Sequence, residues 1–180
     1  IVNVALPSIQ IDLDFSQENL QWVISAYALV FGGFLLLGGR AADLLGRKRI
    51  FLGGLVIFTV ASFLAGTAWS EASLIGARAL QGLGAAIISP AALSILSVTF
   101  REGRERNIAL GVWGAVGGVG AAAGVLLGGV LTETLSWSWI FFVNVPVGAA
   151  ALVVAPLLLS ESRDASAKSF DVPGAVLVTS

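Results

Sequence analysis

Long runs of apolar residues without a charge set the first constraint on what this chain can fold into. Two of them, Leu20–Gly39 and Ile50–Ser70, each have the roughly 20 residues that a helix needs to cross a ~30 Å hydrocarbon layer. The connection between them, residues 39–49, carries four of the ten basic residues and one carboxylate. A charged turn of this kind is excluded from lipid and has to lie at a membrane face. The sequence therefore predicts an integral membrane protein.

The same kind of run recurs along the chain and indicates helices, because strands of a membrane barrel are about ten residues long and alternate strictly. We expect an all-α integral membrane fold. A six-helix bundle occupies residues 1–160, a polar cytoplasmic linker 161–171, and the start of a seventh helix 172–180. We expect the first and last helices to be cut, since the chain starts without Met and stops inside an apolar run. The runs are Ile1–Ile11, Leu20–Gly39, Ile50–Ser70, Ala72–Phe100, Asn107–Thr132, Thr134–Ser160 and Val172–Ser180.

Composition excludes several classes of functional site. The chain contains no Cys and no His, which excludes disulfides, thiolate metal sites and the usual zinc and haem sites. No carboxylate lies inside a complete predicted helix, so the paired acids of a hydrolytic enzyme are missing. We therefore expect no catalytic residue, no metal site, no enzyme activity and no nucleic-acid partner.

The charges outside the apolar runs are segregated by sign. Nine of the ten basic residues fall in alternate connections, around residues 40–49, 101–106 and 163–168, and the opposite connections contain only acidic ones. Loops rich in Lys and Arg stay in the cytoplasm. We therefore expect the basic connections to face the cytoplasm. The acidic residues of the opposite connections are Asp12, Asp14, Glu18, Glu71 and Glu133.

Arg78 is the one charge inside the run Ala72–Phe100. A central arginine costs about 2.5–3.5 kcal/mol on insertion scales and needs a polar partner or a wet cavity. Gln81 and Gly82 follow three and four residues later, so they share a helix face with it. Two interpretations stand: a functional cation inside the membrane, which we favour, or a side chain that snorkels to the outer surface.

The run Asn107–Thr132 is rich in glycine. Each glycine costs about 1 kcal/mol relative to alanine inside a helix, so close packing against another backbone has to offset that cost. Ordinary helix packing is the simplest interpretation of such spacings. The glycines are Gly111, Gly114, Gly117, Gly118, Gly120, Gly124, Gly128 and Gly129.

Polar residues on the first two predicted helices are candidates to line a substrate path. They include Asn3, Ser25 and Tyr27. Each is a weak signal alone, because a single hydroxyl usually bonds within its own helix.

Four motifs in the same order resemble those of the major facilitator superfamily, over essentially the full chain. This chain contains Gly39-x-x-x-Asp43-x-x-Gly46-Arg47-Lys48-Arg49, which is similar to the family's signature loop between helices two and three. The helix-four motif of proton-linked members is similar to Leu74-x-x-x-Arg78-x-x-Gln81-Gly82-x-Gly84. The antiporter motif of helix five resembles Gly111-x₈-Gly120-x₃-Gly124-Val125-x₂-Gly128-Gly129, with Val125 where the motif has proline. Two segments of this chain resemble the drug:proton antiporter branch with fourteen helices, namely Asn3–Pro7 and Trp137–Pro146.

The resemblance implies alternating access between two six-helix halves, of which this chain is the N-terminal one plus the start of an inserted helix pair. Asp43 and Arg47 would form a cytoplasmic charge latch that favours the outward-facing state, within a gating loop that also contains Gly39, Gly46, Lys48 and Arg49. The alternative for this loop is simple anchoring at the cytoplasmic face. Arg78 would take part in proton coupling, with Gln81 and Gly82. The glycine helix would seal the interface between the halves, and the acidic residue of helix one would precede Ile1.

We therefore predict proton-coupled efflux of hydrophobic or cationic drug-like compounds across a bacterial cytoplasmic membrane. The expected partners are the lipid bilayer, the missing C-terminal half, a small hydrophobic substrate and protons. No cofactor is expected, since the proton gradient supplies the energy. Two alternatives remain: a uniporter or symporter of a metabolite in the same superfamily, and a structural membrane bundle that transports nothing.

Overall fold

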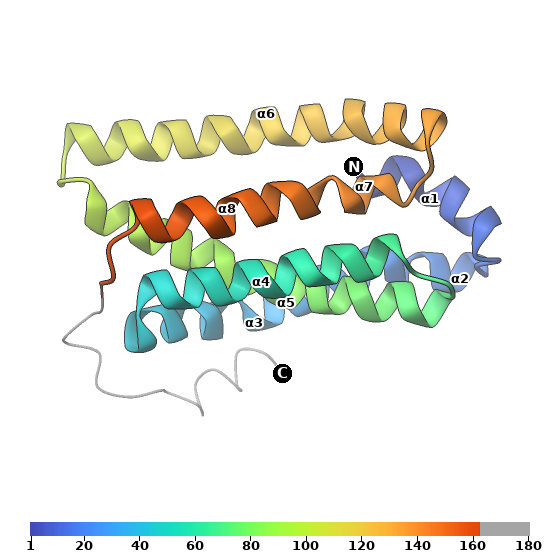
Figure 1. Cartoon of the computed structure of the whole chain (residues 1–180), viewed down its shortest axis with the longest axis horizontal. Coiled ribbons are helices and arrows are strands. Elements are labelled where there is room, and N and C mark those ends of the chain that lie inside the picture. The colour runs from blue at the N-terminus through green and yellow to red at the C-terminus, as the bar shows by residue number, and fades with distance from the viewer. Residues whose placement is uncertain (163–180) are drawn as a thin grey trace.

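A computed structural model describes residues 1–162, and every regular element in this range is a helix (Figure 1). The predicted linker beyond Ser162 and the predicted seventh helix lie outside the described residues. The helices are α1 Val2–Asp12, α2 Gln17–Leu20, α3 Trp22–Leu45, α4 Arg47–Gly66, α5 Glu71–Thr99, α6 Arg104–Thr134, α7 Trp139–Phe142 and α8 Asn144–Leu158.

Five helical segments in the described range are long and apolar enough to cross a membrane. They are Gln17–Leu45, Arg47–Gly66, Glu71–Thr99, Arg104–Thr134 and Trp139–Leu158. The first joins α2 to α3 and the last joins α7 to α8, and α1 adds a shorter sixth helix of 11 residues. The all-helical membrane fold expected from the apolar runs is therefore confirmed.

The basic residues of the described connections gather at one end of the bundle, together with acidic partners such as Asp43 and Glu102. The α3–α4 and α5–α6 junctions lie at the same end of the view as the end of α8 (Figure 1). The junctions at the opposite end contain Asp12, Asp14, Glu71 and Glu133. The bundle thus has one basic and one acidic end, as the positive-inside rule requires of a protein with one orientation.

The predicted connection at residues 39–49 is shorter than expected, because helix continues through nearly all of it. Helix α3 runs on to Leu45 and α4 begins at Arg47, so Gly46 alone separates them. Gly46 has φ +112°, a conformation that L side chains rarely adopt. The charges there lie on helix ends. Polar residues of good helix propensity extend a membrane helix beyond the apolar layer, so the apolar run understates the helix length.

Helix α5 lies at the centre, and its small residues bring the neighbouring backbones close. A Cβ added to Gly82 would lie 2.5 Å from the Tyr27 carbonyl oxygen of α3, and one added to Gly84 would lie 2.6 Å from the Phe58 nitrogen of α4. Side chains larger than hydrogen are therefore excluded at both positions. The two glycines let α3 and α4 approach opposite sides of α5 and form a tightly packed three-helix unit.

Polar contacts join the helices at the acidic end. The Trp137 indole Nε1 donates to Asp12 Oδ2 at 2.7 Å, which ties α1 to the start of α7. Glu71 accepts from the Ser16 backbone N–H and from Asn19 Nδ2, at 2.8 and 2.7 Å. These contacts lie over a buried core that includes Ile9, Val23, Leu74, Ile140 and Phe141.

Helix α6 is the least buried of the five long apolar helices in the described part of the chain. Its one buried residue is Gly128, where an added Cβ would lie 2.7 Å from Ile1. Nothing lies within 4 Å of an added Cβ at Gly111 or Gly120, and a Cβ added at Gly124 or Gly129 would be at ordinary contact distance from Ile1 or Val4, respectively. The close packing expected for this helix is present at Gly128 and absent at Gly111 and Gly120, where no described atom lies near enough to contact an added Cβ.

We predict that Gly84→Ala destabilises the protein, while Gly76→Ala on the same helix does not. The added methyl at position 84 meets the Phe58 backbone, which costs roughly 1–3 kcal/mol for an overpacked core. Position 76 has open space around it, so alanine there only improves helix propensity. Thermal unfolding of the two purified variants in detergent checks this, and equal midpoints would contradict the close approach of α4 to α5.

Candidate functional site

Arg78 is buried inside the three-helix unit, with 6% of its surface exposed. Its Nε donates to the Val23 carbonyl oxygen of α3 at 2.8 Å, and its Nη1 donates to Gln81 Oε1 one turn along α5. The side chain therefore points between the helices and does not snorkel to the outer surface. The Val23 carbonyl is accessible to it because Gly82 lets the α3 backbone come close.

The partner of Arg78, Gln81, is itself held by a serine on α4. Gln81 Nε2 donates to Ser62 Oγ at 2.7 Å, and the Ser62 hydroxyl donates to the Phe58 carbonyl oxygen at 2.8 Å. Gln81 is 2% exposed and Ser62 is fully buried. Every buried side-chain nitrogen and oxygen in the described part of the chain has a hydrogen-bond partner, so this polar chain is complete.

Two aromatic rings face the guanidinium group. The Arg78 Cζ atom lies 4.3 Å from the centre of the Tyr27 ring and 5.9 Å from that of Phe141. A cation over a ring face is stabilised by the ring quadrupole, more strongly where water is absent. We call Val23, Tyr27, Ser62, Arg78 and Gln81 the Arg78 cluster. Among the described residues, no carboxylate forms an ion pair with Arg78.

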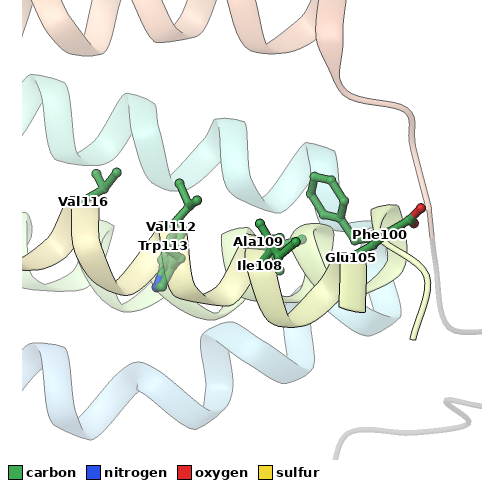
Figure 2. A pocket seen from close by; sticks show the side chains of 8 residues that line it. Phe100, Glu105, Ile108, Ala109, Val112, Trp113 and Val116 are labelled. Atoms are coloured by element: carbon green, nitrogen blue, oxygen red, sulfur yellow. The ribbon is translucent and has the colours of Figure 1, made fainter. Parts of the chain in front are cut away.

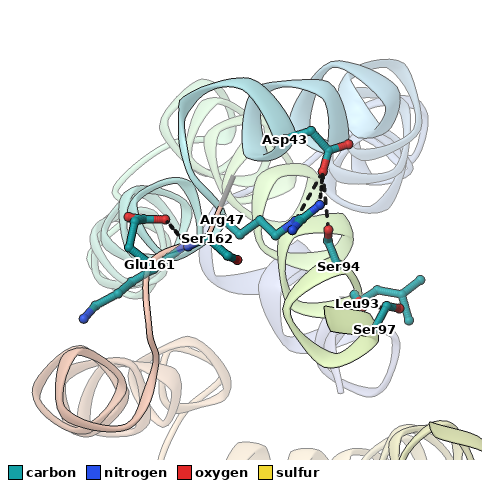
Figure 3. Close-up of polar contacts among 8 residues, drawn as sticks. Asp43, Arg47, Leu93, Ser94, Ser97, Glu161 and Ser162 are labelled. Atoms are coloured by element: carbon teal, nitrogen blue, oxygen red, sulfur yellow. Dashed lines mark hydrogen bonds and ion pairs between the residues drawn. The ribbon is translucent and has the colours of Figure 1, made fainter. Parts of the chain in front are cut away.

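The second group of predicted residues meets at the basic end of the bundle. Arg47 Nε and Nη2 donate to Asp43 Oδ1 at 3.3 and 3.1 Å, and Ser94 Oγ of α5 donates to the same oxygen at 3.4 Å (Figure 3). The ion pair crosses the break at Gly46 and joins the end of α3 to the start of α4. The Asp43 side chain remains 32% exposed.

Glu161, which follows α8, binds the start of α4. It was not among the predicted site residues. Its carboxylate accepts the backbone N–H groups of Lys48 and Arg49 at 3.2 and 3.3 Å and lies 3.7 Å from Arg49 Nε. The Ser162 carbonyl accepts the Arg47 N–H at 3.0 Å, and Figure 3 shows this segment beside the Asp43–Arg47 pair. Acidic side chains stabilise helix N-termini, where free N–H groups gather. The 112-residue separation between Glu161 and Arg49 explains why sequence spacing missed it.

Of the substrate-path candidates, Ser25 lines a cavity of about 430 Å³ near the acidic end, together with Gln10, Gln17 and Gln21. Tyr27 instead belongs to the Arg78 cluster, and Asn3 is exposed on α1. The structure therefore does not bring the three candidates into one site.

A larger, apolar cavity of about 730 Å³ lies between the end of α5 and the first half of α6 (Figure 2). Glu105 is the one charged residue that lines it. The lining residues are Leu96, Phe100, Glu105, Ile108, Ala109, Val112, Trp113 and Val116.

Comparison with known families decides the assignment. The sequence profile of the Major Facilitator Superfamily matches residues 1–177. The chain belongs to the Major Facilitator Superfamily. Together with the five long apolar helices, this makes it an integral, multi-pass membrane protein. The resemblance seen in its four motifs is confirmed, and so is the prediction that the chain is not an enzyme.

Several similar members of the superfamily are named as antibiotic resistance or export proteins. The puromycin resistance protein pur8 of Streptomyces alboniger is 51% identical over 98% of this chain, and the cephamycin export protein CmcT of Amycolatopsis lactamdurans is 49% identical over 99%. The tetracenomycin C resistance and export protein of Streptomyces glaucescens is 41% identical over 99%. The chain covers 35%, 37% and 33% of these relatives, so it spans about a third of their length.

A solved structure confirms the superfamily fold. A crystal structure of a mutant of the peptide transporter POT with alafosfalin matches with a TM-score of 0.74 at 17% identity. The match covers 87% of this chain and 35% of the transporter. At this identity the likeness concerns the fold alone.

We predict that Glu161→Ala lowers the free energy of unfolding by about 1 kcal/mol, the usual effect of losing a helix cap. Glu102→Ala is the matched control, because Glu102 is an exposed partner of Arg106 at the same end of the bundle and such pairs contribute little. Unfolding in detergent compares the two variants. A loss for Glu102→Ala as large as that for Glu161→Ala would contradict the capping role.

Proposed function

We propose that this chain forms part of an exporter of antibiotics and other hydrophobic or cationic drug-like compounds. The support is the similarity to relatives named for puromycin resistance, cephamycin export and tetracenomycin C export, at 41–51% identity over nearly the whole chain. Those relatives come from Streptomyces and Amycolatopsis, so we place this protein in a bacterial cytoplasmic membrane. A second transporter half, outside this chain, completes the substrate path.

The single observation that supports proton coupling is the buried Arg78 cluster. A guanidinium in an apolar bundle, with backbone, amide and ring contacts and no carboxylate partner among the described residues, is a fixed positive charge. Such a charge favours the deprotonated form of any carboxylic acid that comes near it. Movement of an acid toward and away from Arg78 would then alternate proton release and uptake, with the proton gradient as the energy source.

The Asp43–Arg47 pair is proposed as the cytoplasmic latch of the transport cycle. It lies at the basic end, where α3 meets α4, and its carboxylate is partly exposed toward further partners. An exposed acid at this position can accept hydrogen bonds from a helix start of the second half and hold the cytoplasmic side closed. Gly39, Gly46, Lys48 and Arg49 complete this gating segment.

The glycine face of α6 is proposed to pack against the second half during rocking. Gly111 and Gly120 are open in this structure, which leaves room for another backbone. The cavity beside Ser25 is proposed as a part of the substrate path that faces outward.

We predict that Arg78→Ala abolishes proton-driven export by the full-length transporter. The test uses proteoliposomes with an acidic interior and a fluorescent cationic dye, and measures dye movement and internal pH together. Arg78→Lys keeps the charge but loses the planar fork that reaches both the Val23 carbonyl and Gln81. We expect it to reduce coupled export by about tenfold or more.

Each outcome of this assay bears on a different part of the proposal. Dye movement in the wild type that ignores the pH gradient would overturn proton coupling and leave facilitated diffusion. No movement of any drug-like dye would overturn the drug assignment. Full coupled export by Arg78→Ala would remove Arg78 from the mechanism.

We also predict that Asp43→Asn reduces the export rate by about tenfold, the effect of shifting the conformational equilibrium by about 1.4 kcal/mol. Glu102→Gln is the control, because Glu102 forms the same kind of four-residue ion pair, with Arg106, at the same end of the bundle. Initial export rates in the same vesicles distinguish them. Equal rates for both variants would reduce Asp43 to an anchoring role.

A further inference from the structure

Ser62 is a buried polar residue that none of the recognised motifs contains. It lies on α4, one of three buried polar or charged residues within the described range, and the other two are Arg78 and Gln81. All three belong to one chain of hydrogen bonds. Buried polar groups that connect in this way usually specify one arrangement of the core.

The direction of the hydrogen bonds determines how Gln81 must point. The Ser62 hydroxyl donates its only proton to the Phe58 carbonyl oxygen at 2.8 Å, so its oxygen can only accept from Gln81. The Gln81 carboxamide therefore presents its NH₂ group to Ser62 and its oxygen to Arg78. The reverse orientation would place NH₂ against the guanidinium, where two donors meet without an acceptor.

We propose that Ser62 is a positioning residue that orients Gln81 and thereby holds the Arg78 guanidinium at its place inside the bundle. Ser62 acts through Gln81, since the hydrogen bonds of Arg78 in this cluster go to Val23 and Gln81. The chain of bonds also joins all three helices, from α4 through α5 to α3. The inference rests on the proposed role of Arg78 in proton-coupled export.

The positioning role of Ser62 depends on the close approach of the α3 and α4 backbones to α5. Gly84 lets α4 approach α5 until Phe58 is in contact with it, and Gly82 does the same for α3 at Tyr27. Ser62 follows Phe58 by one turn of α4, so the same approach that requires Gly84 brings the hydroxyl within reach of Gln81. The hydroxyl therefore lies fully buried between α4 and α5.

The test is a double-mutant cycle in the full-length transporter, with Ser62→Ala and Gln81→Leu. We expect Ser62→Ala to lower the maximal rate of proton-driven dye export by about tenfold, with the half-saturating dye concentration within about twofold of wild type, since no dye contact changes. In the Gln81→Leu background, Ser62→Ala should cause no further loss, because no carboxamide remains to be oriented.

Ser97→Ala is the matched control. Ser97 also donates to a carbonyl four residues earlier on its helix, that of Leu93 at 2.8 Å, but it is only partly buried and lies near the end of α5. If Ser62→Ala fails to fold, Gln81→Asn provides the second route, because a carboxamide shorter by one methylene cannot reach Ser62 and Arg78 together. We expect it to show the same rate loss.

The outcomes separate this inference from the proposed function. If wild type exports and Ser62→Ala equals Ser97→Ala, the positioning role is overturned while export stands. Additive losses in the cycle would also overturn it, since they indicate that Ser62 contributes only packing. If the wild type shows no coupled export while Ser62→Ala shifts the thermal unfolding midpoint only when Gln81 is present, the proposed function fails and the orientation of Gln81 by Ser62 stands.

Discussion

A guanidinium group within an apolar bundle has to find its hydrogen-bond acceptors inside the protein, and the central part of this structure meets that requirement. Arg78 uses a backbone carbonyl of α3 and the amide oxygen of Gln81. The α3 carbonyl is accessible only because Gly82 lets that backbone come closer than ordinary side chains permit, whereas Gln81 lies three residues along the same helix as Arg78. The glycines of α5 therefore serve the polar cluster as much as the packing, because they set the distance over which its bonds form.

At the basic end of the bundle, the backbone N–H groups at the start of α4 also need acceptors from other parts of the protein. Two helices that meet at a single residue, Gly46, leave the first N–H groups of α4 without partners inside that helix. Glu161 and Ser162 supply acceptors for three of them, and Asp43 pairs with Arg47 across the break. The residues that follow α8 are thereby connected to the segment that we propose as the cytoplasmic latch.

Much of this arrangement was predictable from the sequence, and the exceptions have physical reasons. Apolar run length predicted the membrane helices, and the resemblance of the Asp43–Arg47 segment to the family's signature loop predicted their ion pair, because both are readable from short stretches of sequence. Glu161 and Ser62 were missed, because their partners lie 112 and 19 residues away in the chain. Contacts of that kind depend on which helices become neighbours. The end of α3 and the start of α4 were misplaced for another reason: charged residues end the apolar run, but the helix continues through them beyond the apolar layer.

The contact between Asp12 and Trp137 has a consequence for the order in which the protein assembles. The two residues are 125 positions apart, and loops of that length close slowly compared with contacts between neighbouring helices. During synthesis α1 enters the membrane long before Trp137 exists, whereas α3, α4 and α5 acquire one another as they emerge. The contacts of the central unit can therefore form early, whereas the Asp12–Trp137 contact can form only after the α6–α7 junction has been made. Helix α1 is thus synthesised well before the tryptophan to which it is hydrogen-bonded.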